Sequence, residues 1–348
     1  MRKGSETLRQ LARWMPRAAL APFGRPVALF FHGVTSQIED PRIEINHHAL
    51  DAFRAIAMQL KRHFDVLPLE ALPDTLAQPE RHTRTVFLMS DDGYANAMTV
   101  AAGVLDELRL PWTLFISTRH VETGEWNPLI LARLFIHFAP DGNYYVPHLH
   151  GAIELRGASQ RESVVASVLQ ALKRLPAAKA RESIEAMMAA FSAARLAELR
   201  TKFETERYLT WNEVAALHRR GVEIGAHAHW HWPMNAFQSV DELRAQAQSP
   251  RDAIVSRLGR CRYFAYPFGN IGDISDEAWQ AVRDAGYNHA FTTFSGTLGA
   301  GLNPWLLPRY ALRAEETHLP ALLPLLRMAD RRLATLSTAP RLAMRLPR

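Results

Sequence analysis

The feature that most constrains the fold of this 348-residue chain is the alternation of short apolar segments with longer amphipathic ones. The apolar segments are too short for buried helices and end at glycine or polar residues, which is typical of buried strands. The longer segments repeat apolar residues at helical spacing, as Leu50, Phe53, Ile56 and Leu60 do. Strands that alternate with helices lie parallel, so we expect an α/β fold, either an open sheet or a closed barrel.

Helix starts support this alternation, because Thr210 with Glu213 and Ser239 with Glu242 have the spacing of capping boxes. Proline removes a helical hydrogen bond, so we expect the second of these helices to break at Pro250. The expected strands are 26–33, 64–69, 85–89, 111–117, 222–226, 263–265 and 289–293, and the expected helices are 50–62, 97–110, 211–220, 240–258 and one after Ser275.

One stretch departs from the alternation. At about 162–206 the sequence is rich in Ala, Leu, Arg and Glu, with apolar residues at helical spacing and no strand-like run. We therefore expect a helical insertion on one face of the α/β body. The expected organisation is a basic N-terminal segment at 1–25, a body at 26–318 that contains the insertion, and a basic amphipathic tail at 319–348.

Basic residues are concentrated at the two ends of the chain. The whole chain has 41 Lys and Arg and 35 Asp and Glu. The tail mixes leucine clusters with arginines, which suits either an interfacial helix on an anionic membrane or a helix that closes the body. An anionic membrane surface is thus an expected partner, whereas nucleic acid is not. Cys261 is the sole cysteine, which excludes an intramolecular disulfide.

The expected location is the cytoplasm, peripheral to the inner face of the membrane. The sequence has no apolar run of about 18 residues, which a spanning helix needs. A secretory signal needs an uninterrupted apolar core. Every candidate stretch near the start is interrupted, by Arg9, Arg13, Pro16 or Arg17.

Two groups of polar residues follow expected strands, where α/β barrels place catalytic side chains. The first is Asp91-Asp92-Gly93. Neighbouring side chains diverge, so one aspartate can bind a metal while the other accepts a proton from water, although the same tripeptide is also typical of a plain turn.

The second group holds His227, His229 and His231. A helical turn brings residues four apart onto one face, so His227 and His231 point together and His229 elsewhere. With 15 histidines this spacing can arise by chance, and its place at a strand end gives it weight. Two histidines and an aspartate leave coordination positions open, as in catalytic zinc sites.

Five segments in this order resemble the polysaccharide deacetylases with a NodB-homology domain. They are FFHGV (30–34), SDDGYANA (90–97), LTWNEVAALHRRGVEIGAHAHWHWPM (209–234), YFAYPFGN (263–270) and LPRYAL (307–312). The resemblance implies a distorted (β/α)7 barrel and a metal-dependent carbohydrate esterase. It makes Asp91 the general base and assigns one divalent metal to Asp92, His227 and His231. Zinc is the expected metal, with cobalt, nickel and manganese as alternatives.

The same resemblance places substrate contacts on aromatic residues near the motifs. Tyr266, Pro267 and Phe268 would form a wall of the substrate groove, and Tyr94 would lie beside the aspartates. Sugar rings stack on aromatic faces, so Trp230 or Trp232 is also expected in the groove.

Several positions depart from the family pattern. Met89-Ser90 replaces Thr-Phe, and Ala228 replaces a hydroxyl residue after the first metal histidine. Ala265 stands where an arginine often braces the catalytic aspartate, so we expect Arg309 to take that role. No Leu-x-His motif supplies a general acid near the C-terminus. His32 stands where the poly-N-acetylglucosamine deacetylase-like branch places its acid, although a strand-end histidine bonded to backbone is the alternative.

Two functions remain. The first is a hydrolase that removes N-acetyl, or another small N-acyl group, from an amino-sugar-containing saccharide, free or lipid-linked, in exopolysaccharide or cell-envelope biosynthesis. The second is a catalytically impaired relative that only binds carbohydrate, since a fold does not guarantee its chemistry.

Overall fold

A single parallel sheet forms the centre of the chain in the computed structural model, which describes residues 25–270, 272–313 and 319. The strand order is β11-β10-β9-β6-β5-β1-β12, and the short β4 (Asp65–Val66) pairs beside β5. The strands of this order are β1 (Val27–Phe31), β5 (Thr85–Ser90), β6 (Thr113–Ile116), β9 (Glu223–Ala226), β10 (Tyr263–Ala265), β11 (His289–Phe291) and β12 (Tyr310–Ala311).

The chain around Leu307 joins the two edges of this sheet. Tyr310 of β12 pairs with Leu29 of β1, whereas Leu307 forms a parallel bridge with Phe291 of β11. The Thr292 amide also donates to the Leu307 carbonyl at 2.8 Å. One short segment thus closes seven parallel strands into a ring, and the expectation of a distorted (β/α)7 barrel is confirmed.

Helices connect the strands, as their amphipathic sequences predict. Both capping boxes are present, at Thr210 and Ser239. The segment expected as one helix at 97–110 begins with a π-helical turn at Ala97–Ala101. The barrel helices are α2 (Leu50–His63), α3 (Leu72–Ala77), α4 (Ala102–Glu107), α5 (Thr118–Thr123), α10 (Trp211–Arg219), α11 (Val240–Leu258) and α12 (Asp276–Asp284).

The expected break at Pro250 is wrong, because α11 runs through it from Val240 to Leu258. Proline removes one backbone hydrogen bond and crowds the preceding turn. Leu243, Ala247 and Ile254 are buried on both sides of it, and Pro250 is buried with them. This packing outweighs the local cost.

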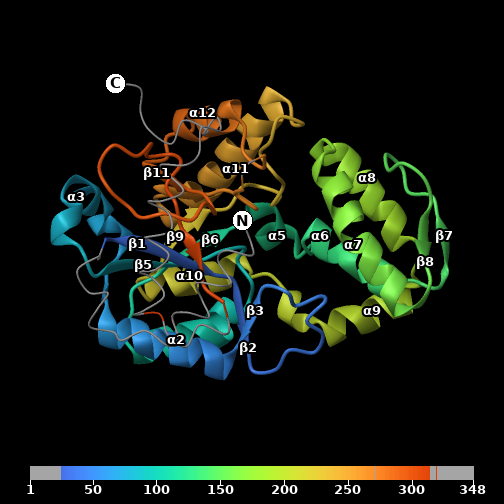
Figure 1. Cartoon of the computed structure of the whole chain (residues 1–348), viewed down its shortest axis with the longest axis horizontal. Helices are drawn as coiled ribbons and strands as arrows, with labels where there is room; N and C mark the ends of the chain where they lie inside the picture. The colour runs from blue at the N-terminus through green and yellow to red at the C-terminus, as the bar shows by residue number, and fades with distance from the viewer. Residues whose placement is uncertain (1–24, 271, 314–318, 320–348) are drawn as a thin grey trace.

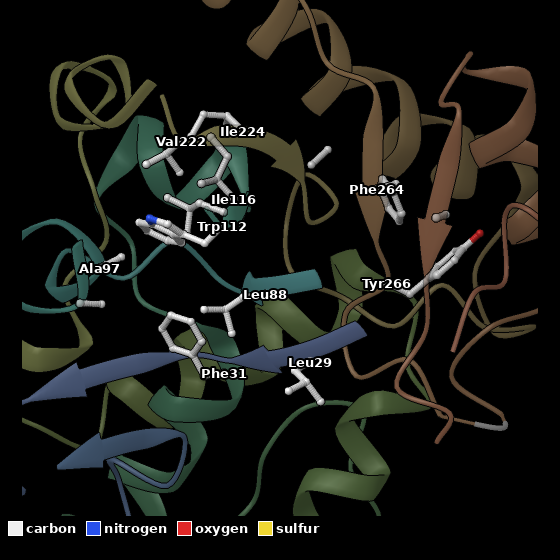
Figure 2. Packing of buried hydrophobic residues seen from close by; sticks show 14 of the residues in the cluster. Leu29, Phe31, Leu88, Ala97, Trp112, Ile116, Val222, Ile224, Phe264 and Tyr266 are labelled. Carbon is white, nitrogen blue, oxygen red and sulfur yellow. The ribbon is translucent and has the colours of Figure 1, made fainter. Parts of the chain in front are cut away.

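Alternate residues of the strands face opposite sides of the sheet, as the pleat requires. Leu29, Phe31, Leu88, Ile116 and Ile224 belong to a large buried cluster with the surrounding helices (Figure 2). The intervening residues form a smaller cluster on the other side, which contains Ala28, Phe30, Phe87, Met89, Phe115 and Phe291. Most strand residues on both sides are therefore apolar, which explains why the strands appear in the sequence as nearly continuous apolar runs.

The chain between β6 and β9 forms a second body beside the barrel (Figure 1). It has its own hydrophobic cluster. We call residues 127–206 the insertion; it begins before the expected 162–206 and includes a hairpin. Its elements are α6 (Pro128–Phe138), β7 (Gly142–Tyr144), β8 (Ile153–Leu155), α7 (Gly157–Lys173), α8 (Ala177–Met188) and α9 (Ala193–Lys202).

A parallel pair, β2 (Gly33–Thr35) and β3 (His47–Ala49), follows β1. Among the described residues, no helix has both the length and the apolar character needed to cross a bilayer. The basic segment 1–24 and the tail after Arg313, apart from Leu319, lie outside the described residues, and so does the expected membrane-contacting surface.

Candidate metal centre and active site

Asp91 and Asp92 directly follow β5 in a tight turn. The Asp91 amide donates to the Phe31 carbonyl at 3.0 Å, so the chain is still tied to β1 at this point. Asp92 then takes a left-handed conformation with φ of +76°, and Gly93 one of +89°. A left-handed residue other than glycine costs conformational energy and is common at functional sites. The turn separates the directions of the two carboxylates.

Asp92, His227 and His231 converge in the interior. Their candidate ligand atoms all lie within 4.8 Å of one another, and all three side chains are buried. Asp92 Oδ1 is 3.2 Å from His227 Nε2 and 2.8 Å from His231 Nε2. Burial raises the pKa of Asp92, but His231, His32 and His227 outweigh it and hold the pKa well below its usual value. The carboxylate is therefore ionised at neutral pH.

This donor set fits a metal ion. His227 Nδ1 lies 2.7 Å from the Ala265 carbonyl, which can only accept, so Nδ1 carries the ring proton. In the neutral ring, Nε2 then directs a lone pair at Asp92 Oδ1. A cation between these two atoms would satisfy both, and neither buried oxygen of Asp92 has a hydrogen-bond partner among the described residues. Two imidazoles and one carboxylate suit zinc and its neighbours.

The loop that carries the histidines is held by polar groups of β6 and α11. Ala228 and His231 both have left-handed backbones, with φ of +57° and +51°. The Ser117 hydroxyl donates to the His227 carbonyl at 2.7 Å. Gln246 Oε1 accepts from the amides of residues 229 and 230 at 2.9 and 3.0 Å. These contacts orient the loop, although Ala228 lacks the usual hydroxyl.

His229 faces away from the other two histidines. Its Nδ1 lies 2.9 Å from the Thr118 hydroxyl, and only its backbone takes part in the loop. The group of three convergent ligands does not include it. The sequence likewise predicts that His229 points away from His227 and His231.

Asp91 is paired with Arg309 across the barrel. The guanidinium donates to both carboxylate oxygens, Nη1 to Oδ1 at 2.8 Å and Nη2 to Oδ2 at 2.7 Å. Arg309 is fully buried over the rings of Phe30 and Phe115, and its Nε donates to the Thr292 carbonyl. Burial raises the pKa of Asp91, but Arg309 more than offsets it and the pKa lies below its usual value. Asp91 is thus a fixed, ionised carboxylate.

His32 follows β1 at the same end of the barrel. The Ser90 hydroxyl donates to its carbonyl at 3.0 Å, and its half-buried ring meets Phe30 edge-on. The ring is close enough to help lower the pKa values of both Asp91 and Asp92. A half-exposed imidazole therefore stands beside the two carboxylates.

Comparison with known proteins shows which family the chain belongs to. Residues 78–290 match the family model described as polysaccharide deacetylase, a stretch that runs from before β5 into β11. The chain belongs to the polysaccharide deacetylase family. No curated protein matches the sequence.

Solved structures of similar fold include deacetylases. The Streptococcus pyogenes deacetylase PplD in complex with acetate is 15% identical, with a TM-score of 0.56, and the match covers 86% of this chain and 98% of that one. IcaB from Ammonifex degensii is also 15% identical, with a TM-score of 0.52 and coverage of 86% and 97%. At this identity the likeness shows a shared fold.

Three aromatic residues expected to contact substrate in this polysaccharide deacetylase are buried in its core. Tyr94 is 1%, Trp232 2% and Tyr266 0% exposed. Tyr266 donates to the Trp305 carbonyl, and Trp232 donates to the Leu175 carbonyl in the insertion. These large aromatic side chains fill the core of the structure, and their expected role as substrate contacts stays a prediction. Pro267 is buried as well.

Phe268 and Trp230 remain half-buried beside the metal ligands. The Phe268 ring meets His231 edge-on at 4.9 Å, and Lys173 Nζ of the insertion lies 3.6 Å from its centroid. Arg181 of the insertion covers Trp230 in the same way, at 3.7 Å. Among the six residues expected to contact substrate, Trp230 and Phe268 are the two that keep exposed surface in the structure.

A buried polar cluster next to Asp92 has no signature in the sequence. Glu206, at the end of the insertion, is 1% exposed, and burial raises its pKa well above the usual value. Its Oε1 lies 3.4 Å from His47 Nδ1, while His47 Nε2 faces the Thr205 carbonyl. Burial lowers the pKa of His47 to about 4. Burial therefore disfavours the charged form of both side chains.

Metal removal should destabilise the protein. A metal that binds only the folded chain, at a free concentration 100 times its dissociation constant, adds about 2.7 kcal/mol to the free energy of unfolding. We expect a higher melting temperature with zinc than after chelation. Replacing His231 with Ala should remove most of this shift. Stoichiometric zinc binding in a variant that lacks both Asp92 and His231 would contradict the assignment.

Proposed function

We propose that this family member is a metal-dependent hydrolase that removes N-acetyl groups from an amino-sugar-containing saccharide. The observation that carries the proposal is the ion pair of Asp91 with Arg309, placed beside the convergent ligands Asp92, His227 and His231. A protein that only binds saccharide has no use for a fixed, ionised base next to an open metal site.

Different side chains of the protein carry out the two proton transfers of the reaction. Asp91, held by Arg309, accepts a proton from the attacking water. As the new C–O bond forms and the amide C–N bond breaks, His32 donates a proton to the departing nitrogen, which leaves acetate and a free amine. A divalent metal bound by Asp92, His227 and His231 would supply Lewis acidity at the amide carbonyl. Zinc suits this donor set best, with cobalt, nickel and manganese as alternatives.

The impaired, carbohydrate-binding alternative is the weaker proposal. It rests on two departures from the family pattern, Ala265 in place of the bracing arginine and the missing Leu-x-His motif. The Arg309 guanidinium, however, contacts both oxygens of Asp91, and we assign the acid role to His32. The acid role of His32 favours the poly-N-acetylglucosamine deacetylase-like branch. We further propose that body 26–318 works on a free or lipid-linked saccharide, held at the cytoplasmic membrane surface by the basic segments 1–25 and 319–348.

Product analysis tests the proposed reaction. The purified, zinc-loaded chain is incubated with N-acetylglucosamine oligomers of increasing length, and acetate and free amine are both measured. We expect equal amounts of the two products, released by the wild-type protein and not by Asp91→Asn. Saccharide binding without release of acetate would support the binding relative instead.

His32→Gln should reduce kcat by about 100- to 10,000-fold, the usual contribution of a general acid, with KM changed much less. His82→Gln is a matched control, because His82 is also half-buried but lies before β5, at the far end of that strand. The control should keep its kcat. A near-normal rate in His32→Gln would remove the acid role from this residue.

A further inference from the structure

Asn127 links the insertion to the metal centre. It is buried and forms the N-cap of α6, where its Oδ1 accepts a hydrogen bond from the Leu129 amide at 2.9 Å. Its Nδ2 lies 2.8 Å from Nδ1 of His231, the ring nitrogen that faces away from Asp92. One side-chain amide therefore serves both the start of a helix and a candidate metal ligand.

The two candidate histidine ligands are held by different kinds of group. His227 Nδ1 faces the backbone carbonyl of Ala265, which can only accept, so the proton on that ring is fixed. His231 Nδ1 faces a side-chain amide, which can donate through its nitrogen or accept through its oxygen. The partner of His231 can therefore adapt to either tautomer.

Each tautomer of His231 corresponds to one state of the centre. Without a metal, Nδ1 accepts from Asn127, so the neutral ring carries its proton on Nε2, the nitrogen that lies 2.8 Å from Asp92 Oδ1. When Nε2 binds a metal, the neutral ring carries its proton on Nδ1 and needs an acceptor there. Rotation of the Asn127 amide by half a turn would present that acceptor. The same rotation would turn Nδ2, which can only donate, toward the Leu129 amide, so the side-chain cap of α6 would be lost.

We infer that Asn127 is a positioning residue that orients His231 for metal binding and couples metal occupancy to the first turn of α6. This inference rests on the metal site of the proposed function and does not depend on the reaction. His231 has a left-handed backbone, with φ of +51°, so its ring direction needs outside support. The following residues Leu129 and Ile130 are buried in the core of the insertion, which fixes the position of Asn127.

Two substitutions separate this role from simple helix capping. Asn127→Ser keeps a good N-cap residue but is too short to reach His231. Asn127→Asp keeps the cap and presents only oxygen acceptors. Asn235→Ser is the matched control, because Asn235 is also a buried amide that ties the barrel to the insertion, through the Lys173 carbonyl, and it contacts no candidate ligand.

The experiment measures the zinc dissociation constant of the full chain by competition with a chromophoric chelator, together with the melting temperature of the metal-free protein. Outer partners of metal-bound histidines typically contribute about 10- to 100-fold in affinity. We expect Asn127→Ser to weaken zinc binding by that factor with a nearly unchanged metal-free melting temperature. Asn127→Asp should bind at least as tightly as wild type, and the control should match wild type.

Two outcomes would overturn the inference. Wild-type zinc affinity in Asn127→Ser would make Asn127 a helix cap alone. Equal weakening in the Ser and Asp variants would assign the effect to packing, because the Asp variant keeps the acceptor. Since zinc affinity is read without turnover, a chain that shows the expected affinities but releases no acetate would retain this inference and lose the proposed function.

Discussion

Asp91→Asn is expected to lower kcat by at least about 100- to 10,000-fold, the contribution of a general base, while the metal content stays at the wild-type level. The amide cannot accept the proton of the attacking water, yet Asp91 is not among the convergent ligands. Activity and bound metal are measured on the same preparation, by product release and elemental analysis.

Asp92→Asn provides the contrast, because this carboxylate faces both ligand histidines. It should lose metal and activity together. Equal metal loss in Asp91→Asn and Asp92→Asn would reject the division of roles between the two aspartates. A melting curve for each variant verifies that the loss is not one of folding, since Asp91→Asn also leaves Arg309 without its charged partner.

Arg309→Met should cost about 3–5 kcal/mol in the free energy of unfolding, the usual result of removing one partner of a buried ion pair. Both side chains are buried, so Asp91 would remain as an uncompensated charge. Burial would no longer be offset by Arg309 and would raise the pKa of Asp91 relative to wild type, which weakens it as an ionised base. Denaturant unfolding at neutral pH measures the loss.

The double variant Asp91→Asn with Arg309→Met should lose much less stability than the sum of the single variants, because it leaves no unpaired charge. The exposed pair of Arg54 and Glu107 is the control, and Arg54→Met should cost at most about 1 kcal/mol. Additive effects on the free energy of unfolding would show that there is no coupling free energy between Asp91 and Arg309.

The pairing of Asp91 and Arg309 should also depend on pH. The folded pKa of Asp91 is below its ordinary value, so the pair stabilises the fold above the ordinary pKa of an aspartate. That contribution is lost as the pH falls through the folded pKa. The wild-type protein should therefore lose more stability on acidification than the double variant.

The sequence by itself predicted parallel strands joined by helices and the convergence of the candidate ligands, whereas the choice of a closed barrel came from the family resemblance. Apolar runs alternating with amphipathic segments predict parallel strands, and the carboxyl ends of such strands meet at one end of the barrel. Asp92 follows β5 and His227 follows β9, so their approach needed only the strand positions. The spacing of His227 and His231 predicted that the two rings converge, but the expected helical turn is wrong, because a loop with left-handed backbones at Ala228 and His231 brings them together instead.

Only the tertiary structure decided which residues support that centre. Asn127, Gln246 and Glu206 reach it from the insertion and α11, and such approaches depend on connection paths that sequence spacing does not encode. The burial of Trp232 and Tyr266 was likewise invisible, since an aromatic ring suits a core and a sugar site equally well. Local periodicity fixes elements and their ends, whereas burial and long-range pairing arise only when distant segments pack against one another.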